Sequence, residues 1–171
     1  MPDQWTMGNL RRAAETYPLR GPVLDVGAGD FASWMRPVFV DRGLAYFALD
    51  QRAAEGIDIV GDVTDTRTWT GPPSLRRGPR WGTVVLMSVV EHAANPERVV
   101  RACRRLLRRG GHLIFAAPIC WPHHDFPADY WRILPAGARL LLDGMDVLEL
   151  VTEAGDDYTV QNQVFAVARK A

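Results

Sequence analysis

The stretch Val23-Leu24-Asp25-Val26-Gly27-Ala28-Gly29-Asp30 decides the fold of this chain. Its first four residues are mostly apolar, which predicts a short buried strand. Two glycines follow at once, and glycine accepts a positive φ and lets a ligand approach the backbone closely. The stretch therefore predicts a strand-to-helix turn that binds a cofactor.

Short apolar runs alternate with amphipathic segments on both sides of this turn. Helices are predicted over residues 6–17, 31–41, 96–108 and 135–142, with Pro37 kinking the second and Gly110-Gly111 ending the third. Strands are predicted over residues 23–26, 44–49, 57–60, 83–89, 112–116, 147–151 and 163–168. This alternation predicts an α/β fold, a Rossmann-like three-layer sandwich with a mostly parallel seven-stranded sheet. The short link at residues 155–157 predicts that the last strand is antiparallel.

The composition indicates one globular domain over residues 1–171, with residues 1–20 forming an N-terminal helix that completes the pocket. The chain has 20 basic and 20 acidic residues, so it lacks the positive charge of a nucleic-acid binder. It has no apolar run of about 20 residues and no secretory signal, which predicts a cytoplasmic protein without membrane contact. The expected oligomeric state is a monomer or a homodimer. Residues 64–80 are rich in glycine, proline and arginine, which predicts a surface loop that can act as a lid.

The glycine turn by itself is compatible with two cofactors. A dinucleotide pattern G-x-G-x-x-G/A also fits, through Gly27, Gly29 and Ala32, and Asp50 lies where such enzymes bind a ribose hydroxyl. However, Asp25 and Asp30 would place carboxylates beside the pyrophosphate of a dinucleotide. S-adenosylmethionine has no phosphate and carries a sulfonium and an ammonium group. The acidic residues around the glycines therefore favour S-adenosylmethionine.

Further motifs follow the turn in a definite order. They are Asp50 at the end of residues 45–50, then Gly61-Asp62-Val63, Ser88-Val89-Val90-Glu91-His92, Asn95-Pro96-Glu97 and Leu106-Leu107-Arg108-Arg109-Gly110-Gly111. With Asp25-x-Gly27-x-Gly29 before them, these motifs resemble the class I S-adenosylmethionine-dependent methyltransferases, and within them the type 11 family, over nearly the whole chain. The resemblance implies a methyltransferase whose cofactor is S-adenosylmethionine.

The resemblance also implies which residues bind the cofactor. Asp50 takes both ribose hydroxyls, and Asp62 holds the adenine together with the backbone amide of Val63. The implied set is Asp25, Gly27, Ala28, Gly29, Asp50, Gln51, Asp62, Val63 and Ser88. Two positions depart from the family pattern, because Phe31 stands where a further glycine is frequent and Gly82 replaces an acid. The plain alternative is that Asp50 and Asp62 only cap helices.

The acceptor is expected beyond the carboxyl ends of the fourth and fifth strands. Methyl transfer requires alignment of two reactants and, for a hydroxyl acceptor, removal of a proton. Histidine is the natural base near neutral pH, so His124 is the first candidate and His92 the second. The function expected is O-methylation of a small molecule from a biosynthetic pathway. The alternatives are that His92 caps the next helix and that Asp129 with Arg132 forms a local ion pair.

No metal is expected from the sequence. Glu91 and His92, with a histidine after the fifth strand, are similar to the metal site of certain 2'-O-methyltransferases of small RNAs and of some quinone methyltransferases. Those proteins carry a further glutamate where this chain has Ser88, which removes an anionic ligand. Other functions remain open: a nicotinamide-dependent oxidoreductase, a non-catalytic partner subunit with this fold, or a nucleic-acid methyltransferase that uses the arginines of residues 101–109.

Overall fold

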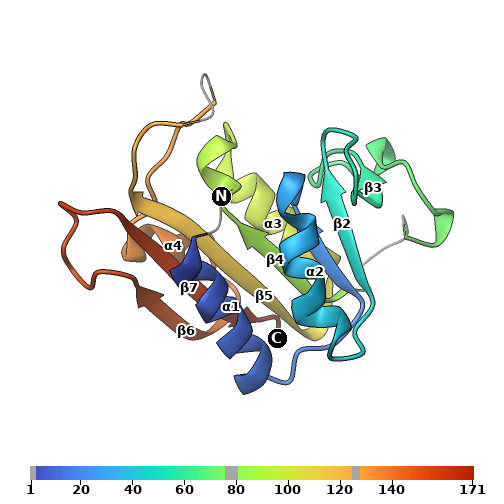
Figure 1. Ribbon diagram of the computed structural model, residues 1–171, viewed down its shortest axis with the longest axis horizontal. Helices are drawn as coiled ribbons and strands as arrows, with labels where there is room; N and C mark the ends of the chain where they lie inside the picture. Colours follow the sequence, from blue (N-terminus) through green and yellow to red (C-terminus); the bar gives the residue numbers. More distant parts are fainter. Residues whose placement is uncertain (1–2, 76–80, 125–127) are drawn as a thin grey trace.

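The computed structural model describes residues 3–75, 81–124 and 128–171. Its centre is a seven-stranded sheet in the order β3-β2-β1-β4-β5-β7-β6 (Figure 1). The strands are β1 (Val23–Val26), β2 (Tyr46–Asp50), β3 (Ile59–Val60), β4 (Trp81–Met87), β5 (Leu107–Cys120), β6 (Asp146–Thr152) and β7 (Asn162–Arg169). Strands β1 to β5 pair in parallel, whereas β7 is antiparallel to β5 and β6. The predicted fold, with its antiparallel last strand, is confirmed.

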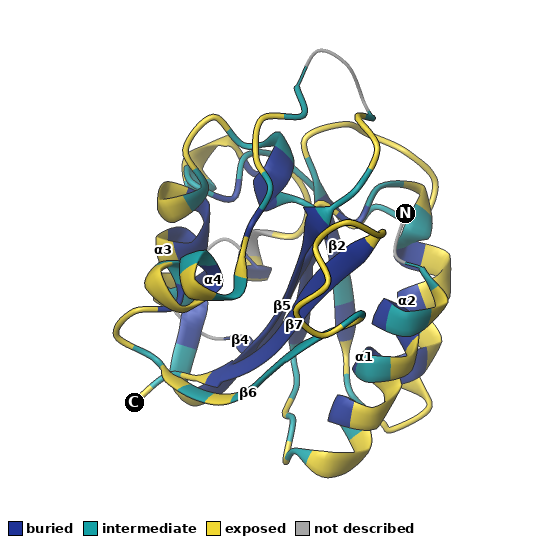
Figure 2. Cartoon of the chain, turned by 90° about the vertical axis from the view of Figure 1, so that its left-hand side faces the viewer, coloured by how far each residue is buried: buried dark blue, intermediate teal, exposed yellow. Residues whose placement is uncertain are grey.

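Helices cover both faces of the sheet and make three layers (Figure 2). α1 (Gln4–Thr16) and α2 (Ala32–Val40) lie on one face, and α3 (Pro96–Leu106) and α4 (Pro135–Leu141) lie on the other. Successive strand residues point to opposite faces, so Val84 of β4 joins the core under α3 whereas Val85 joins the core under α1 and α2. Because both faces are covered, the central strands are apolar almost throughout.

Two helices begin at side chains that cap their free backbone N–H groups. Asp3 caps α1 by accepting a hydrogen bond from the backbone N of Thr6 at 2.7 Å. Asn95 caps α3 in the same way through the backbone N of Arg98 at 2.9 Å. Pro96 follows as the first residue of α3, where its missing N–H costs nothing. The four predicted helices are therefore present with starts close to those predicted.

The end of the third helix differs from the prediction. α3 stops at Leu106, because Leu107 pairs with Trp81 and begins β5. β5 continues through Gly110-Gly111 to Cys120, well beyond the predicted residues 112–116. It pairs with β4 on one side and with β7 on the other, and these long-range hydrogen bonds extend it. The prediction that Gly110-Gly111 ends the helix is wrong.

The segment between β3 and β4 is partly fixed to the core. Residues 64–75 contain two 3₁₀ turns, Thr66–Thr68 and Pro73–Leu75. Trp69 between them is buried, and its Nε1 donates a hydrogen bond to the carbonyl oxygen of Asp62 at 2.8 Å. Residues 76–80 lie outside the described residues, so the lid remains a prediction. Within the described ranges, no helix has the length and apolar character needed to cross a membrane.

Candidate functional site

A cavity of about 980 Å³ opens at the carboxyl ends of the parallel strands. This is where ligands bind in open α/β sheets. Each of the strands β1 to β5 contributes a segment at or just after its end to the cavity wall. The first three segments are residues 26–31 at the end of β1, 49–54 at the end of β2 and 61–63 after β3. The segment at the end of β4 contributes Met87, Ser88, Val89, His92 and Ala93, and the segment after β5 contributes Trp121, His124 and Ala128. The cavity thus brings together residues that are spread over about 100 positions of sequence.

The glycine turn forms one wall and needs its glycines. Gly27 and Gly29 have φ values of 68° and 47°, in the left-handed region that favours glycine. The backbone N of Gly27 donates a hydrogen bond to the carbonyl oxygen of Leu49 at 2.8 Å, which ties the turn to β2. A Cβ atom at Gly27 would lie 2.6 Å from Cγ2 of Val89. A larger residue at position 27 would therefore strain the backbone and push against the segment after β4.

Asp50 lies beside this turn at the end of β2. Its Oδ2 accepts a hydrogen bond from the backbone N of Gly29 at 3.0 Å, and its Oδ1 accepts one from the backbone N of Arg52 at 2.9 Å. The oxygen Oδ1 of Asp62, at the end of β3, accepts a hydrogen bond from the backbone N of Thr64 at 2.7 Å. Neither aspartate is the N-cap of a described helix. Both carboxylates are instead oriented by turns that border the cavity.

Most of the predicted cofactor residues line the cavity. They are Gly27, Ala28, Gly29, Asp50, Gln51, Asp62, Val63 and Ser88. Ser88 has a φ of 55°, the one positive value at a non-glycine residue in the described part of the chain. Such backbone strain is common where a chain is held in place for function. Two methionines of the wall, Met35 and Met87, were missed because they look like ordinary core residues in the sequence.

Asp25 is the exception among the predicted cofactor residues, because it does not line the cavity. It is 1% exposed and accepts a hydrogen bond from the hydroxyl of Tyr46. Burial raises the pKa of Asp25 to about 7, although the hydrogen bond from Tyr46 opposes this change. Its side chain lies on the sheet face under α1 and α2, where it contacts Tyr46 and does not reach the cavity.

The N-terminal helix does not complete the cavity as predicted. No described residue of the first 20 contributes to the cavity wall. The apolar side of α1, made by Met7, Leu10 and Ala13, is packed into the core on its face of the sheet. That packing directs the helix along the sheet rather than across the carboxyl ends of the strands.

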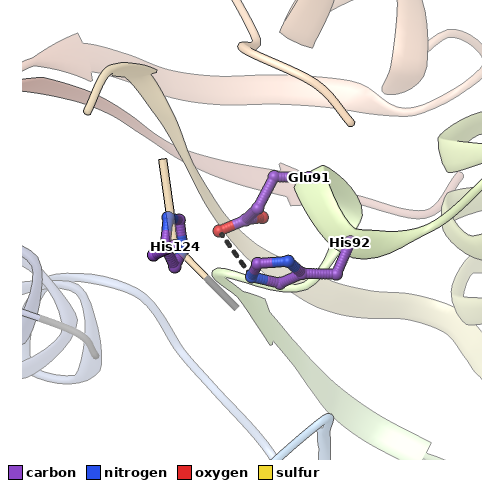
Figure 3. A group of neighbouring side chains, drawn as sticks. All are labelled: Glu91, His92 and His124. Atoms are coloured by element: carbon purple, nitrogen blue, oxygen red, sulfur yellow. Dashed lines mark ion pairs between the residues drawn. The ribbon is translucent and has the colours of Figure 1, made fainter. Parts of the chain in front are cut away.

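Three titratable side chains meet after β4 and β5 (Figure 3): His92 and His124 line the cavity, and the buried Glu91 lies beside them. Glu91 is 1% exposed, and its Oε1 lies 3.9 Å from Nε2 of His92. The rings of His92 and His124 are 4.8 Å apart between centroids and meet edge to face. Burial raises the pKa of Glu91 to about 7, with the charge of Asp129 adding to the effect. Both histidines predicted as bases are therefore neighbours on the cavity wall.

Both imidazole rings are oriented by acceptor groups at Nδ1. Nδ1 of His92 lies 2.8 Å from the carbonyl oxygen of Ala128. Nδ1 of His124 lies 3.1 Å from the carbonyl oxygen of Pro122 and 3.2 Å from Oδ2 of Asp129. These oxygens only accept hydrogen bonds, so each Nδ1 donates the hydrogen that it carries. His92 does not cap α3, because Asn95 does.

Asp129 fixes the segment that carries His124. Arg132 donates to both of its carboxylate oxygens, at 2.6 Å and 2.8 Å, and the side chain of Asp129 has no solvent exposure. The guanidinium of Arg132 lowers the pKa of Asp129 far below its ordinary value. The backbone N of His124 also donates to Asp129. Asp129 and Arg132 thus form the local ion pair that the sequence offered as an alternative to a catalytic role. This ion pair also positions His124. Residues 125–127 lie outside the described residues.

The geometry agrees with a match to a known family. A family model described as a methyltransferase domain matches residues 4–155. The chain belongs to this family. The predicted class, an S-adenosylmethionine-dependent methyltransferase of class I, is thereby confirmed. No curated protein matches the sequence.

Solved methyltransferases share the fold of this methyltransferase at low sequence identity. The 1,6-didemethyltoxoflavin-N1-methyltransferase of Burkholderia thailandensis has a TM-score of 0.69 at 15% identity, over 99% of this chain and 81% of the other. The N-methyltransferase NodS of Bradyrhizobium japonicum WM9 has a TM-score of 0.66 at 15% identity, over 98% and 86%. A methyltransferase of Archaeoglobus fulgidus has a TM-score of 0.67 at 15% identity, over 98% and 94%. At these identities the likeness shows the fold.

Proposed function

We propose that this methyltransferase transfers the methyl group of S-adenosylmethionine to a hydroxyl group of a small molecule. The observation that carries the proposal is the pair His92 and His124, which lies on the wall of the same cavity as the glycine turn and Asp50. One cavity thus holds the glycine turn that is proposed to bind the cofactor and the two candidate bases.

The residues around the turn fit S-adenosylmethionine. Each carboxylate oxygen of Asp50 accepts one backbone N–H and keeps a further lone pair for a ribose hydroxyl. Asp30 and Asp50 both border the turn, which favours a cofactor with a sulfonium and an ammonium over one with a pyrophosphate. When bound, S-adenosylmethionine supplies a methyl carbon that its sulfonium has already activated. The protein then has to align the acceptor and receive its proton.

His124 is the proposed base and His92 the second candidate. The lone pair on Nε2 of His124 can take the proton of the acceptor hydroxyl, while Nδ1–H remains hydrogen-bonded to oxygens of Pro122 and Asp129. The buried carboxylate of Asp129 stabilises the imidazolium that results, as an orienting acid does beside a catalytic histidine. A small acceptor is supported by the solved relatives, one of which acts on 1,6-didemethyltoxoflavin.

A comparison of hydroxyl and amine acceptors tests this proposal. Purified protein would be incubated with S-adenosylmethionine carrying a labelled methyl group, together with matched phenols and neutral amines. His124→Ala should lower the turnover of phenols by about 100-fold or more, because a general base contributes roughly 10² to 10⁴ in rate. A neutral amine needs no prior deprotonation, so its turnover should fall much less. An equal loss for both acceptor types would exclude His124 as a base.

The same incubations, with a parallel titration of the purified protein with NADH, separate the other candidate functions. A non-catalytic partner subunit would bind S-adenosylmethionine and transfer no label to any acceptor. A nicotinamide-dependent oxidoreductase would bind NADH in place of S-adenosylmethionine. Either result would overturn the proposed O-methylation.

A further inference from the structure

A second, much smaller cavity adjoins the large one. It is lined by Ser88, Glu91, Pro118, Trp121, His124 and Gln163. Three of these residues, Ser88, Trp121 and His124, also line the large cavity, so the two spaces are neighbours and share the proposed base. The small cavity leaves about 10 Å³ for the centre of a water-sized group, against about 980 Å³ in the large one. It therefore has room for about one non-hydrogen atom with its hydrogens.

Two residues of this small cavity carry a buried oxygen without a hydrogen-bond partner. In the described part of the chain, five buried side-chain atoms lack a partner, and two of them are Oε2 of Glu91 and Oε1 of Gln163. Glu91 is 1% exposed and Gln163 is 3% exposed. A buried oxygen without a donor costs free energy, so two of them at one cavity call for a ligand that supplies donors.

The amide of Gln163 is held in one orientation by the start of α1. Its Nε2 donates a hydrogen bond to Oδ2 of Asp3, whose Oδ1 caps α1 through the backbone N of Thr6. A carboxylate only accepts hydrogen bonds, so the NH₂ group of Gln163 has to face Asp3 and its oxygen is left for another partner. Gln163 therefore offers the small cavity an acceptor and no donor.

Glu91 gives the small cavity its preference for positive charge. Burial raises the pKa of Glu91 to about 7, and the charge of Asp129 adds to this effect. A cation beside Oε2 opposes both causes and stabilises the ionised carboxylate. A neutral hydroxyl donor stabilises it less, because hydrogen bonds between two charged groups are the stronger ones. The small cavity therefore favours a positively charged group that carries N–H donors.

We propose that the small cavity binds a protonated primary amino group of the methyl acceptor, which donates N–H groups to Glu91 and Gln163. The inference rests on the proposed O-methylation, because it names the class of hydroxyl compound that is methylated. His124 lines both cavities, so the bound amino group lies close to the hydroxyl that this base deprotonates. An ammonium group has no lone pair and cannot accept the methyl group itself. The preferred acceptors are therefore phenols or alcohols with a primary amino group a few bonds from the hydroxyl.

Binding of the amino group can be measured without methyl transfer. The full chain, labelled with ¹⁵N, would be titrated with methylammonium chloride while NMR follows the side-chain NH₂ signals of Gln163, assigned by their loss in Gln163→Leu. We expect a saturable shift with a Kd of roughly 10 mM, which is near the limit for a ligand of two non-hydrogen atoms. Tetramethylammonium has the same charge but no N–H group and should cause no saturable shift. Glu91→Gln should remove the response, whereas Glu97→Gln, the same change at an exposed glutamate, should keep it.

The choice of acceptor can be measured with matched phenols. Transfer of a labelled methyl group would be followed for phenols that carry either an aminomethyl or an ethyl group at the 2-, 3- or 4-position. At the best position, Glu91→Gln should lower kcat/KM for the aminomethyl phenol by about 30-fold or more, because loss of one partner of a buried charge pair is costly. The value for the ethyl phenol should stay within about threefold of the wild type.

The outcomes separate this inference from the proposed function. Circular dichroism would establish that each variant is folded. A wild type that methylates phenols but shows no saturable shift with methylammonium overturns the amino subsite and leaves the proposed function intact. An undiminished shift in Glu91→Gln, or equal losses for both kinds of phenol in that variant, also overturns the subsite. A shift that depends on Glu91, in a chain that methylates no hydroxyl compound, would instead support the subsite and contradict the proposed O-methylation.

Discussion

Replacing Asp50 should weaken the binding of S-adenosylmethionine far more than it weakens the fold. The carboxylate borders the cavity and is held by the backbone N–H groups of Gly29 and Arg52. Asp50→Ala removes the two hydrogen bonds that the ribose hydroxyls are proposed to donate to this carboxylate, each worth about 1.5 to 3 kcal/mol. A loss of roughly 3 kcal/mol corresponds to an increase in Kd of about 100-fold. Isothermal titration calorimetry at constant pH and salt would measure it.

Two comparisons give this measurement its meaning. Asp156→Ala removes an exposed carboxylate on the turn between β6 and β7, and should leave the Kd unchanged. Asp50→Asn keeps an oxygen for the backbone N of Gly29 but loses the charge, so its Kd should lie between those of the wild type and Asp50→Ala. A folded Asp50→Ala variant whose Kd rises less than about threefold would refute the assignment of Asp50 to the ribose.

Three more predictions concern the turn, the base and the buried acid. Gly27→Ala should lower the free energy of unfolding in urea by about 1 to 3 kcal/mol, because the added Cβ would meet Val89 and the φ of position 27 is positive. An unchanged midpoint of urea unfolding would contradict this. His124→Ala should leave the Kd of S-adenosylmethionine within about threefold of wild type in calorimetry while turnover falls; a large change in Kd would place His124 in the cofactor site. Asp25 has a pKa of about 7 in the folded protein and about 3.9 in the unfolded chain. Between these two pH values the folded state binds more protons than the unfolded state. The free energy of unfolding of the wild type should therefore fall as pH rises from 4 to 7, by up to ~4 kcal/mol from Asp25. Asp25→Asn should lose the part of this dependence that Asp25 contributes, in urea unfolding at pH 5 and pH 8, while the part from Glu91 remains. A slope equal to that of the wild type would refute the contribution of Asp25.

The order of helices and strands was predictable because local patterns determine it. Apolar runs marked the strands, and Asn95 with Pro96 marked the start of α3. The length of β5 was not predictable in the same way, since its extra residues are strand only through pairing with Trp81 on β4 and with Asn162 and Gln163 on β7. Such pairings depend on residues far away in sequence.

The wall of the cavity was also largely predictable, because most of the predicted residues lie at or just after the end of a strand and parallel strands end at one edge. Asp25 does not line that wall, for a reason present in the sequence. It is inside β1, two residues before Gly27, and alternation along the strand points it to the sheet face where Tyr46 lies. The burial of Glu91 and the proximity of His92 to His124 could not be predicted, because no local pattern fixes contacts between two loops.

The turn at residues 25–30 is proposed to bind S-adenosylmethionine. Parallel calorimetric titrations of the purified chain with S-adenosylmethionine and with NADH test it directly. The acidic residues at the turn predict saturable binding of S-adenosylmethionine at one site per chain and no binding of NADH, and Asp50→Ala should abolish or greatly weaken the first signal. Binding of NADH alone, with no heat from S-adenosylmethionine, would contradict the claim.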